Sequence, residues 1–204
     1  MRRTDLSTIA ARQGVTDDRV LQAMRDVDRR QFVPPHLADD AHVDGPLPIG
    51  QGQTTSQPSL IGQMLQAAEI SRDDRVLEVG TGFGYQTALL CHLAAEVYSI
   101  ERHDRLADAA RANVASAGLS ARIVVGDGGE GLPDAAPFDA IVVSAAASEI
   151  PSAWCDQLVP GGRLVVPVGG QGSQVVEVRR RVSGGLSTPE RLVGVRFVPL
   201  VRGS

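Results

Sequence analysis

The chain has 204 residues and a formal net charge of -4, and its acidic and basic residues are interspersed. This length is typical of one globular domain. Only 3% of residues are aromatic and no basic run occurs, which argues against a surface that binds nucleic acid. No segment has the apolar length of a membrane span, and no apolar signal segment follows the basic N-terminus. We therefore expect a cytoplasmic, monomeric protein without a nucleic-acid or membrane partner.

The cysteine and histidine residues predict no metal site. Cys91 and Cys155 are far apart in the sequence, and we interpret them as reduced thiols of a cytosolic protein. A disulfide between them is the less favoured alternative. The histidines also lack the spacing of metal ligands; they are His36, His42, His92 and His103.

The N-terminal quarter is predicted to be helical and then irregular. Thr16, followed by two aspartates, is typical of a helix start, because acids there lie at the positive end of the helix dipole. Pro34 and Pro35 should end this helix. Its buried face would be formed by Val20, Leu21, Met24 and Val27.

A stretch rich in Pro, Gly, Gln and Thr follows at residues 36–58 and shows no periodicity. An irregular segment of this length within a compact domain is usually functional. The next helix should begin near Pro58, since proline suits the first helical turn, and end near Ala68.

Strands and helices alternate from Arg75 onward. Strands are expected at residues 76–79, 97–100, 123–125, 140–143 and 164–166, and helices at 85–93 and 104–117. This order predicts a Rossmann-like α/β fold with a mostly parallel, doubly wound sheet. Two alternating segments, 175–182 and 192–198, predict antiparallel strands at the C-terminal edge.

A glycine-rich turn follows the first strand, with the sequence Glu78-Val79-Gly80-Thr81-Gly82-Phe83-Gly84-Tyr85. Open α/β sheets bind ligands at such strand-to-helix junctions. A dinucleotide-binding turn would carry Gly or Ala where Tyr85 stands. An acid two positions before the first glycine suits a cofactor that carries a sulfonium and an ammonium. We therefore predict an S-adenosylmethionine site that includes Glu78, Gly80, Thr81, Gly82 and Tyr85.

Two further acids lie at strand ends. Glu101 ends the second strand, where a carboxylate can accept hydrogen bonds from ribose hydroxyls, and we add its neighbour Arg102 to the cofactor site. Asp127, within Gly126-Asp127-Gly128, could accept from the adenine amino group. The alternatives are a solvated strand end and an Asp-Gly turn. Because carboxyl ends of parallel strands meet at one edge, we expect these acids to face one crevice.

Residues 48–58, with the sequence Pro-Ile-Gly-Gln-Gly-Gln-Thr-Thr-Ser-Gln-Pro, resemble the signature of the protein-L-isoaspartate (D-aspartate) O-methyltransferase family. Other matches occur at residues 32–34, 74–78, 126–128, 160–169 and 195–200. The resemblance implies a class I S-adenosylmethionine-dependent methyltransferase with an N-terminal helical extension. It also implies methylation of the α-carboxylate of L-isoaspartyl residues in damaged proteins or peptides, which initiates repair.

The resemblance also implies roles for single residues. Ser56 matches the active-site serine, Glu101 and Asp127 the ribose and adenine acids, and Gly80 and Gly82 the cofactor loop. Substrate-binding residues are then expected at Thr54, Thr55, Ser56 and Val198.

A substrate carboxyl group is already ionised at neutral pH, so the reaction requires no general base. Ser56 would therefore hold the substrate carboxylate or the cofactor by a hydrogen bond. Its alternative role is to cap the helix that begins at Pro58.

These assignments divide one domain into three parts. Residues 1–57 would form the N-terminal helices and the substrate-side loop, 58–169 the cofactor-binding core, and 170–204 the C-terminal strands.

Three other functions stay open at this point. The chain could be an O-methyltransferase acting on another carboxylate, in a modified peptide or a small metabolite. It could also be a non-catalytic cofactor-binding protein, since Phe83 stands where the family has a small residue. An NAD-dependent oxidoreductase is disfavoured by Tyr85.

Overall fold

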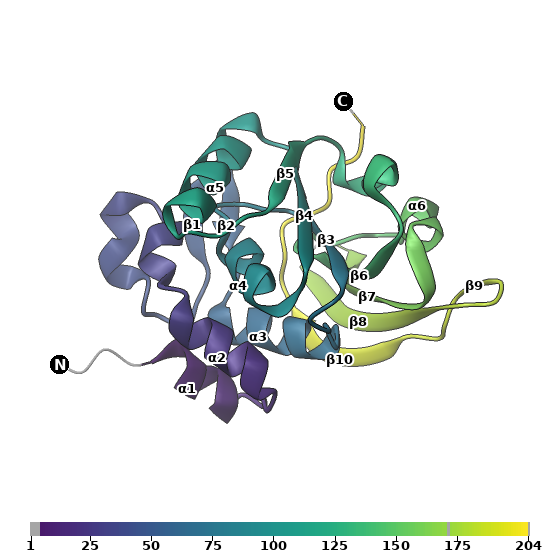
Figure 1. Ribbon diagram of the computed structural model, residues 1–204, viewed down its shortest axis with the longest axis horizontal. Helices are drawn as coiled ribbons and strands as arrows, with labels where there is room; N and C mark the ends of the chain where they lie inside the picture. Colours follow the sequence, from purple (N-terminus) through teal and green to yellow (C-terminus); the bar gives the residue numbers. More distant parts are fainter. Residues whose placement is uncertain (1–4, 171, 204) are drawn as a thin grey trace.

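The computed structural model describes residues 5–170 and 172–203, so the basic start at residues 1–4 lies outside the described residues. A sheet with the strand order β10-β8-β7-β6-β3-β4-β5 forms its centre, and β9 pairs with β8 (Figure 1). The strands are β3 (Arg75–Val79), β4 (Glu96–Glu101), β5 (Arg122–Val125), β6 (Phe138–Val143), β7 (Leu158–Gly170), β8 (Ser173–Val182), β9 (Gly185–Leu186) and β10 (Glu190–Val195).

The five strands from β3 to β7 are parallel, and β8 and β10 add to β7 in antiparallel orientation. The predicted α/β class and the antiparallel C-terminal strands are therefore confirmed. From β3 the chain moves outward to β4 and β5, and then returns to β6 on the other side of β3. Such a reversal opens a crevice at the carboxyl ends of the central strands.

Alternating side chains of the sheet enter two separate hydrophobic clusters. Val76 faces one cluster, whereas Leu77 and Val79 face the other. The first cluster is covered by the helices α1 (Leu6–Arg12), α2 (Asp18–Asp26), α3 (Pro58–Ala67), α4 (Tyr85–Leu93) and α5 (Asp104–Ser116). The second is covered by α6 (Ser152–Asp156) and the short 3-10 turns η3 (Gly128–Glu130) and η4 (Pro133–Ala135).

The indole of Trp154 anchors the second cluster. Trp154 is fully buried, and its Nε1 donates a hydrogen bond to the carbonyl oxygen of Gly128 at 2.8 Å. The ring therefore fixes α6 against the turn that follows β5.

Helix α2 begins as the sequence predicts but ends earlier. The carboxylate of Asp17 caps it by accepting from the backbone N–H of Arg19 and Val20. The predicted end at Pro34 and Pro35 is wrong, because α2 stops at Asp26. Asp28 then caps a separate 3-10 turn, η1 (Arg29–Phe32).

The segment at residues 36–58 is more ordered than predicted. It contains a 3-10 turn, η2 (Pro35–Asp40), and a hairpin of β1 (Leu47–Gly50) and β2 (Gln53–Thr55). Backbone φ is positive from Gly50 to Gly52, which reverses the chain within a few residues. Strands this short give no visible alternation, so the periodicity analysis missed them.

Residues 196–203, here called the C-terminal segment, leave the sheet after β10. The backbone of Ala146 pairs with this segment, since its N–H donates to Val198 and its carbonyl accepts from Leu200. The predicted strand at 192–198 therefore ends early, at Val195. Figure 1 shows the segment, in yellow, passing from β10 toward the end of the sheet where the chain finishes.

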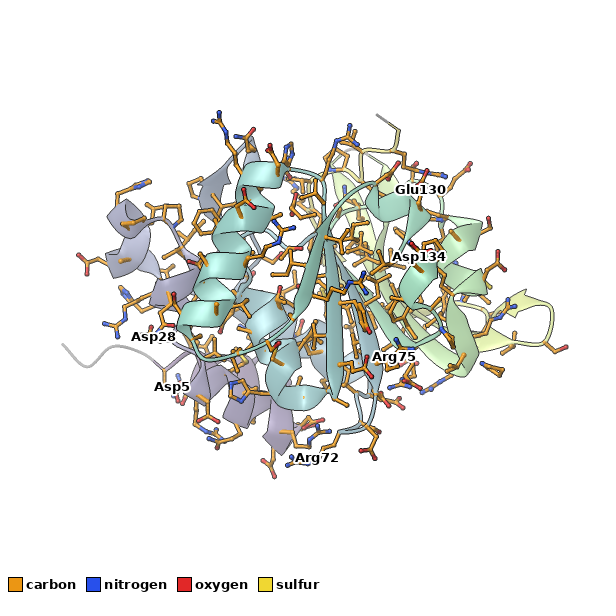
Figure 2. All side chains as sticks on the ribbon, turned by 45° about the horizontal axis from the view of Figure 1, so that its top comes forward. Asp5, Asp28, Arg72, Arg75, Glu130 and Asp134 are labelled. Atoms are coloured by element: carbon orange, nitrogen blue, oxygen red, sulfur yellow. The ribbon has the colours of Figure 1, made fainter. Side chains whose placement is uncertain are left out.

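Polar contacts link β3 and β4 near their amino ends. Arg75, labelled in Figure 2, starts β3; its guanidinium lies 5.3 Å from the Tyr98 ring centroid and 3.3 Å from a Glu96 carboxylate oxygen. The carboxyl end of β3 carries the glycine-rich turn, so the candidate site lies at the opposite end of the sheet. Among the described helices, none has the length and apolarity to cross a membrane.

Candidate active site

A pocket, here called the cavity, lies at the carboxyl ends of β3, β4 and β6, with about 860 Å³ of space between its lining residues, part of it open to solvent. The hairpin β1–β2 borders one side, and the C-terminal segment borders another. Most of the residues predicted from the sequence line it, namely Thr54, Thr55, Ser56, Gly80, Thr81, Gly82, Tyr85, Glu101, Arg102, Gly128 and Val198. Glu78, Gly126 and Asp127 were also predicted, but they are not among the lining residues.

The glycine-rich turn forms one wall of the cavity with its backbone. Gly80 and Gly84 have φ values of 94° and 90°, which side chains rarely tolerate. A Cβ on Gly84 would also lie 3.2 Å from Val114 of α5. Glycine is therefore required both for the turn and for its close packing.

Glu78 lies behind this turn, not in the cavity. Its side chain is fully buried and accepts hydrogen bonds from Gln86 Nε2, Thr87 Oγ1 and Ser99 Oγ. Gln86 also donates to Ser144 at the end of β6. The predicted acid thus supports the turn from behind, and its contact with a cofactor stays a prediction.

Burial raises the pKa of the Glu78 carboxyl to about 7, because desolvation disfavours the charged form. Hydrogen bonds from Thr87, Ser99 and Gln86 lower the pKa and offset part of this rise. The group therefore titrates near neutrality.

Glu101 lines the cavity in a fixed orientation. Its Oε2 accepts from the N–H of Gly82 at 2.9 Å, and its Oε1 accepts from the N–H of His103 at 3.0 Å. Each carboxylate oxygen can accept a second hydrogen bond, so the group retains capacity for two donors. A vicinal diol such as that of ribose fits this capacity.

Asp127 forms the turn that the sequence left open as an alternative. Its carboxylate accepts from Gly129 N at 2.7 Å and from Gly203 N at 2.6 Å. Burial raises its pKa, but these two bonds and the nearby Arg102 and Arg202 outweigh that effect, so the pKa is lowered. The adenine contact predicted for Asp127 stays a prediction.

Arg102 holds the same end of the chain. Its Nη1 donates to the carbonyl oxygens of Gly203 at 2.8 Å and Val201 at 3.3 Å. Together with Asp127, this arginine fastens the C-terminal segment beside the cavity.

Ser56 does not cap α3. Its side chain makes no hydrogen bond within the described part of the chain, and Gln57 holds the cap position. Asp44 supplies the capping interaction from a distance, because it accepts from the N–H and the Oγ of Ser59, both at 2.8 Å. The capping alternative for Ser56 is therefore wrong, and the Ser56 side chain lines the cavity without an intramolecular partner.

A second, wider groove joins the cavity at Ser56. Thr54, Ser144 and Val198 also line both spaces. The groove continues between α3 and β10 along Gln57, Gln63 and residues 193–197. A ligand larger than a nucleoside can therefore extend from the cavity along this groove.

Several lining residues were not predicted. Ser144 follows β6 directly, so the same strand-end rule that selected Glu101 would have found it. Gln86 lies one helical position after Tyr85 and carried no separate signal. Phe83, whose bulk suggested the non-catalytic alternative, lines the cavity wall, and its carbonyl oxygen accepts from Asn113 at 3.0 Å.

Metal ions in proteins are bound by clusters of His, Cys, Asp or Glu side chains. Within residues 5–170 and 172–203, no group of three or more His, Cys, Asp or Glu side chains could hold an ion. Both cysteines are free thiols, and burial raises the pKa of Cys91 to about 12.

The family model described as protein-L-isoaspartate (D-aspartate) O-methyltransferase matches residues 1–204. The chain belongs to this family. A curated protein-L-isoaspartate O-methyltransferase of Methylorubrum populi is 48% identical over 204 residues, covering 97% of this chain and 93% of the relative. One of Methanoculleus marisnigri is 52% identical over 191 residues, covering 93% and 86%.

Solved structures of this family share the fold. A protein-L-isoaspartate O-methyltransferase superposes with a TM-score of 0.87 at 28% identity over 98% of this chain, which spans 66% of that protein's length. A Plasmodium falciparum protein of the same family, solved in complex with S-adenosyl-L-homocysteine, gives a TM-score of 0.85 at 26% identity, with 97% of each chain covered. The fold class that the sequence predicts is thereby confirmed.

The raised pKa of Glu78 predicts a pH-dependent stability. The folded protein keeps a proton that the unfolded chain releases between the ordinary pKa of 4.5 and about 7. The free energy of unfolding should therefore fall as pH rises through this window, and the contribution is lost above it. Glu78→Gln should abolish this dependence in urea unfolding at a series of pH values. Glu190→Gln, at an exposed position on β10, controls for the loss of one charge; equal slopes in all three proteins would contradict the assignment.

Proposed function

We propose that this chain transfers the methyl group of S-adenosylmethionine to the α-carboxylate of L-isoaspartyl residues in damaged proteins or peptides. The main support is that Ser56 and most of the predicted cofactor residues share one cavity. Ser56, whose hydroxyl has no hydrogen-bond partner among the described residues, lines the same cavity as the glycine-rich turn and Glu101. Family membership, and relatives about half identical in sequence, support the same activity.

The cavity fits S-adenosylmethionine by its donor and acceptor set. Gly80 and Gly82 bring backbone close to the ligand without side chains, and Glu101 offers acceptors for the ribose hydroxyls. Gly126, Asp127 and Gly128 would lie toward the adenine, and Arg102 with Tyr85 would close the sides. When bound, this cofactor supplies an electrophilic methyl group on a sulfonium.

The residues of the chain contribute alignment more than proton transfer. An ionised substrate carboxylate is already nucleophilic, so no base is required. Ser56 can donate a hydrogen bond to this carboxylate and fix the direction of attack, while Thr54, Thr55 and Val198 border its place. Alignment of two reactants and exclusion of water can supply a large share of a rate enhancement.

The groove that joins the cavity favours a polypeptide substrate over a small metabolite. It gives room for residues on either side of an isoaspartyl group, and its lining is mostly polar and small. A metabolite would not need this extension. We infer further that the protein acts as a monomer in the cytoplasm, with damaged proteins or peptides as partners and neither nucleic acid nor membrane.

The substrate assignment is tested with two synthetic peptides that differ only at one residue, L-isoaspartate or normal aspartate. Each is incubated with the enzyme and methyl-labelled S-adenosylmethionine, and the base-labile label is counted. We expect the isoaspartyl peptide alone to be labelled, because only its α-carboxylate reaches the position beside Ser56. Labelling of neither peptide, or of both equally, would defeat the proposal.

Ser56→Ala should lower kcat about 10-fold to 100-fold, the value of one hydrogen bond to a charged group. Its thermal unfolding should match the wild type, since the hydroxyl makes no hydrogen bond with residues 5–170 or 172–203. Ser59→Ala is the contrasting variant: it removes a bond to Asp44 and should lower the melting temperature. A Ser56→Ala protein with a lowered melting temperature and an unchanged kcat would contradict the proposed role of the hydroxyl in methyl transfer.

A further inference from the structure

Arg29 is a buried cation that the reaction described above does not use. It follows Asp28, which Figure 2 labels at the start of η1, and only 2% of its surface is exposed. It makes no ion pair with any residue in the described part of the chain. The nearby Asp44 carboxylate favours the positive charge without forming an ion pair. The buried guanidinium is otherwise stabilised by hydrogen bonds, and those bonds show which segments it holds.

The guanidinium donates to four backbone carbonyl oxygens. Nη1 reaches Val43 at 2.9 Å and Ala41 at 3.4 Å, while Nη2 reaches Gly45 at 3.0 Å and Ser56 at 3.2 Å. Three of these acceptors belong to residues 41–45, here called the 41–45 turn. The fourth is the carbonyl of the proposed active-site residue itself.

The 41–45 turn is tied to α3 as well. Asp44, between two residues that bind Arg29, accepts from Ser59 at the start of α3 and from the side chain of Gln57. The chain that leaves Ser56 is thus fixed at two points: the Ser56 carbonyl by Arg29, and the start of α3 by Asp44. A bidentate cation and a distant carboxylate together define where the Ser56 backbone lies.

Arg29 also lies against the other half of the site. Its guanidinium carbon is 5.7 Å from the ring centroid of Tyr85, the first residue of α4 and a lining residue of the cavity. The Tyr85 ring packs in turn on Phe32 of η1, with centroids 6.1 Å apart. The Arg29 side chain therefore contacts both Tyr85, which follows the glycine-rich turn, and the carbonyl of Ser56.

We propose that Arg29 is a positioning residue for methyl transfer, whose guanidinium sets the Ser56 backbone relative to the cofactor loop. This inference rests on the proposed function, because it places the substrate carboxylate beside Ser56. Arginine suits the task, since its planar fork donates to several carbonyls at fixed angles, whereas a lysine ammonium is a point charge on a flexible stem. A displacement of about 1 Å in such a site can lower the rate about 100-fold.

The test compares Arg29→Lys and Arg29→Gln with a matched control, Arg19→Gln. Arg19 also donates to two backbone carbonyls, those of Ile70 and Leu93, but it does not line the cavity. Kinetics with the isoaspartyl peptide give kcat and KM, calorimetry gives the Kd of S-adenosylhomocysteine, and hydrogen exchange with mass spectrometry reports on the backbone.

We expect both Arg29 variants to raise the peptide KM or lower kcat about 10-fold or more, with the Kd of S-adenosylhomocysteine changed less than about 2-fold. Exchange should rise at residues 41–45 and 53–59 and not in β4. Arg19→Gln should reduce thermal stability and leave kcat and KM unchanged. If Arg29→Gln does not fold, the lysine variant, which keeps the charge, carries the comparison.

Three results would overturn the inference: unchanged exchange at residues 41–59, unchanged peptide kinetics despite raised exchange, or an equal kinetic loss in Arg19→Gln. Because hydrogen exchange needs no substrate, it also separates the two proposals. A wild-type protein inactive on the isoaspartyl peptide would refute the proposed function, while unchanged exchange would refute the role of Arg29.

Discussion

The carboxyl of Glu78 is the interaction on which the candidate site depends. Fully buried at the end of β3, it gathers donors from β4 and α4, and Gln86 extends the network to Ser144 after β6. Thr81 of the glycine-rich turn joins through the hydroxyl of Ser99. Because a buried carboxyl without partners is strongly unfavourable, these segments can meet in few other arrangements.

The Glu78 network fixes the side of the site that carries the glycine-rich turn. The other side, which carries Ser56, is built mainly from irregular chain. Apart from the β1–β2 hairpin, this side consists of the 41–45 turn and the C-terminal segment, which have little regular structure and are held by side chains instead. Arg29 and Asp44 secure the approach to Ser56, whereas Arg102 and Asp127 secure the C-terminal segment. The cofactor side is thus organised by a sheet and the substrate side by polar contacts to backbone, which suits a partner as variable as damaged protein.

The sequence predicted the sheet, its antiparallel edge and the starts of α2, α3, α4 and α5, because periodicity, glycine spacing and caps are local signals; it did not predict α1. It also selected Glu101 and Ser56. It failed where long-range contacts decide: Asp44 caps a helix 15 residues away, which frees Ser56, and Arg29 bonds as far as 27 residues along the chain. Glu78 lies at the turn for which it was predicted, but its side chain is buried behind the loop, and spacing cannot distinguish this position from one in front of the loop.

We propose a nucleoside site beside Ser56 that is formed by acids and glycines at the carboxyl ends of β3, β4 and β5. A crystal structure of the protein with S-adenosylhomocysteine tests it most directly. We expect ribose hydroxyls within hydrogen-bond distance of the Glu101 carboxylate and the sulfur directed toward the Ser56 hydroxyl. A ligand seated in the groove along β10, or one whose ribose makes no contact with Glu101, would contradict the proposal.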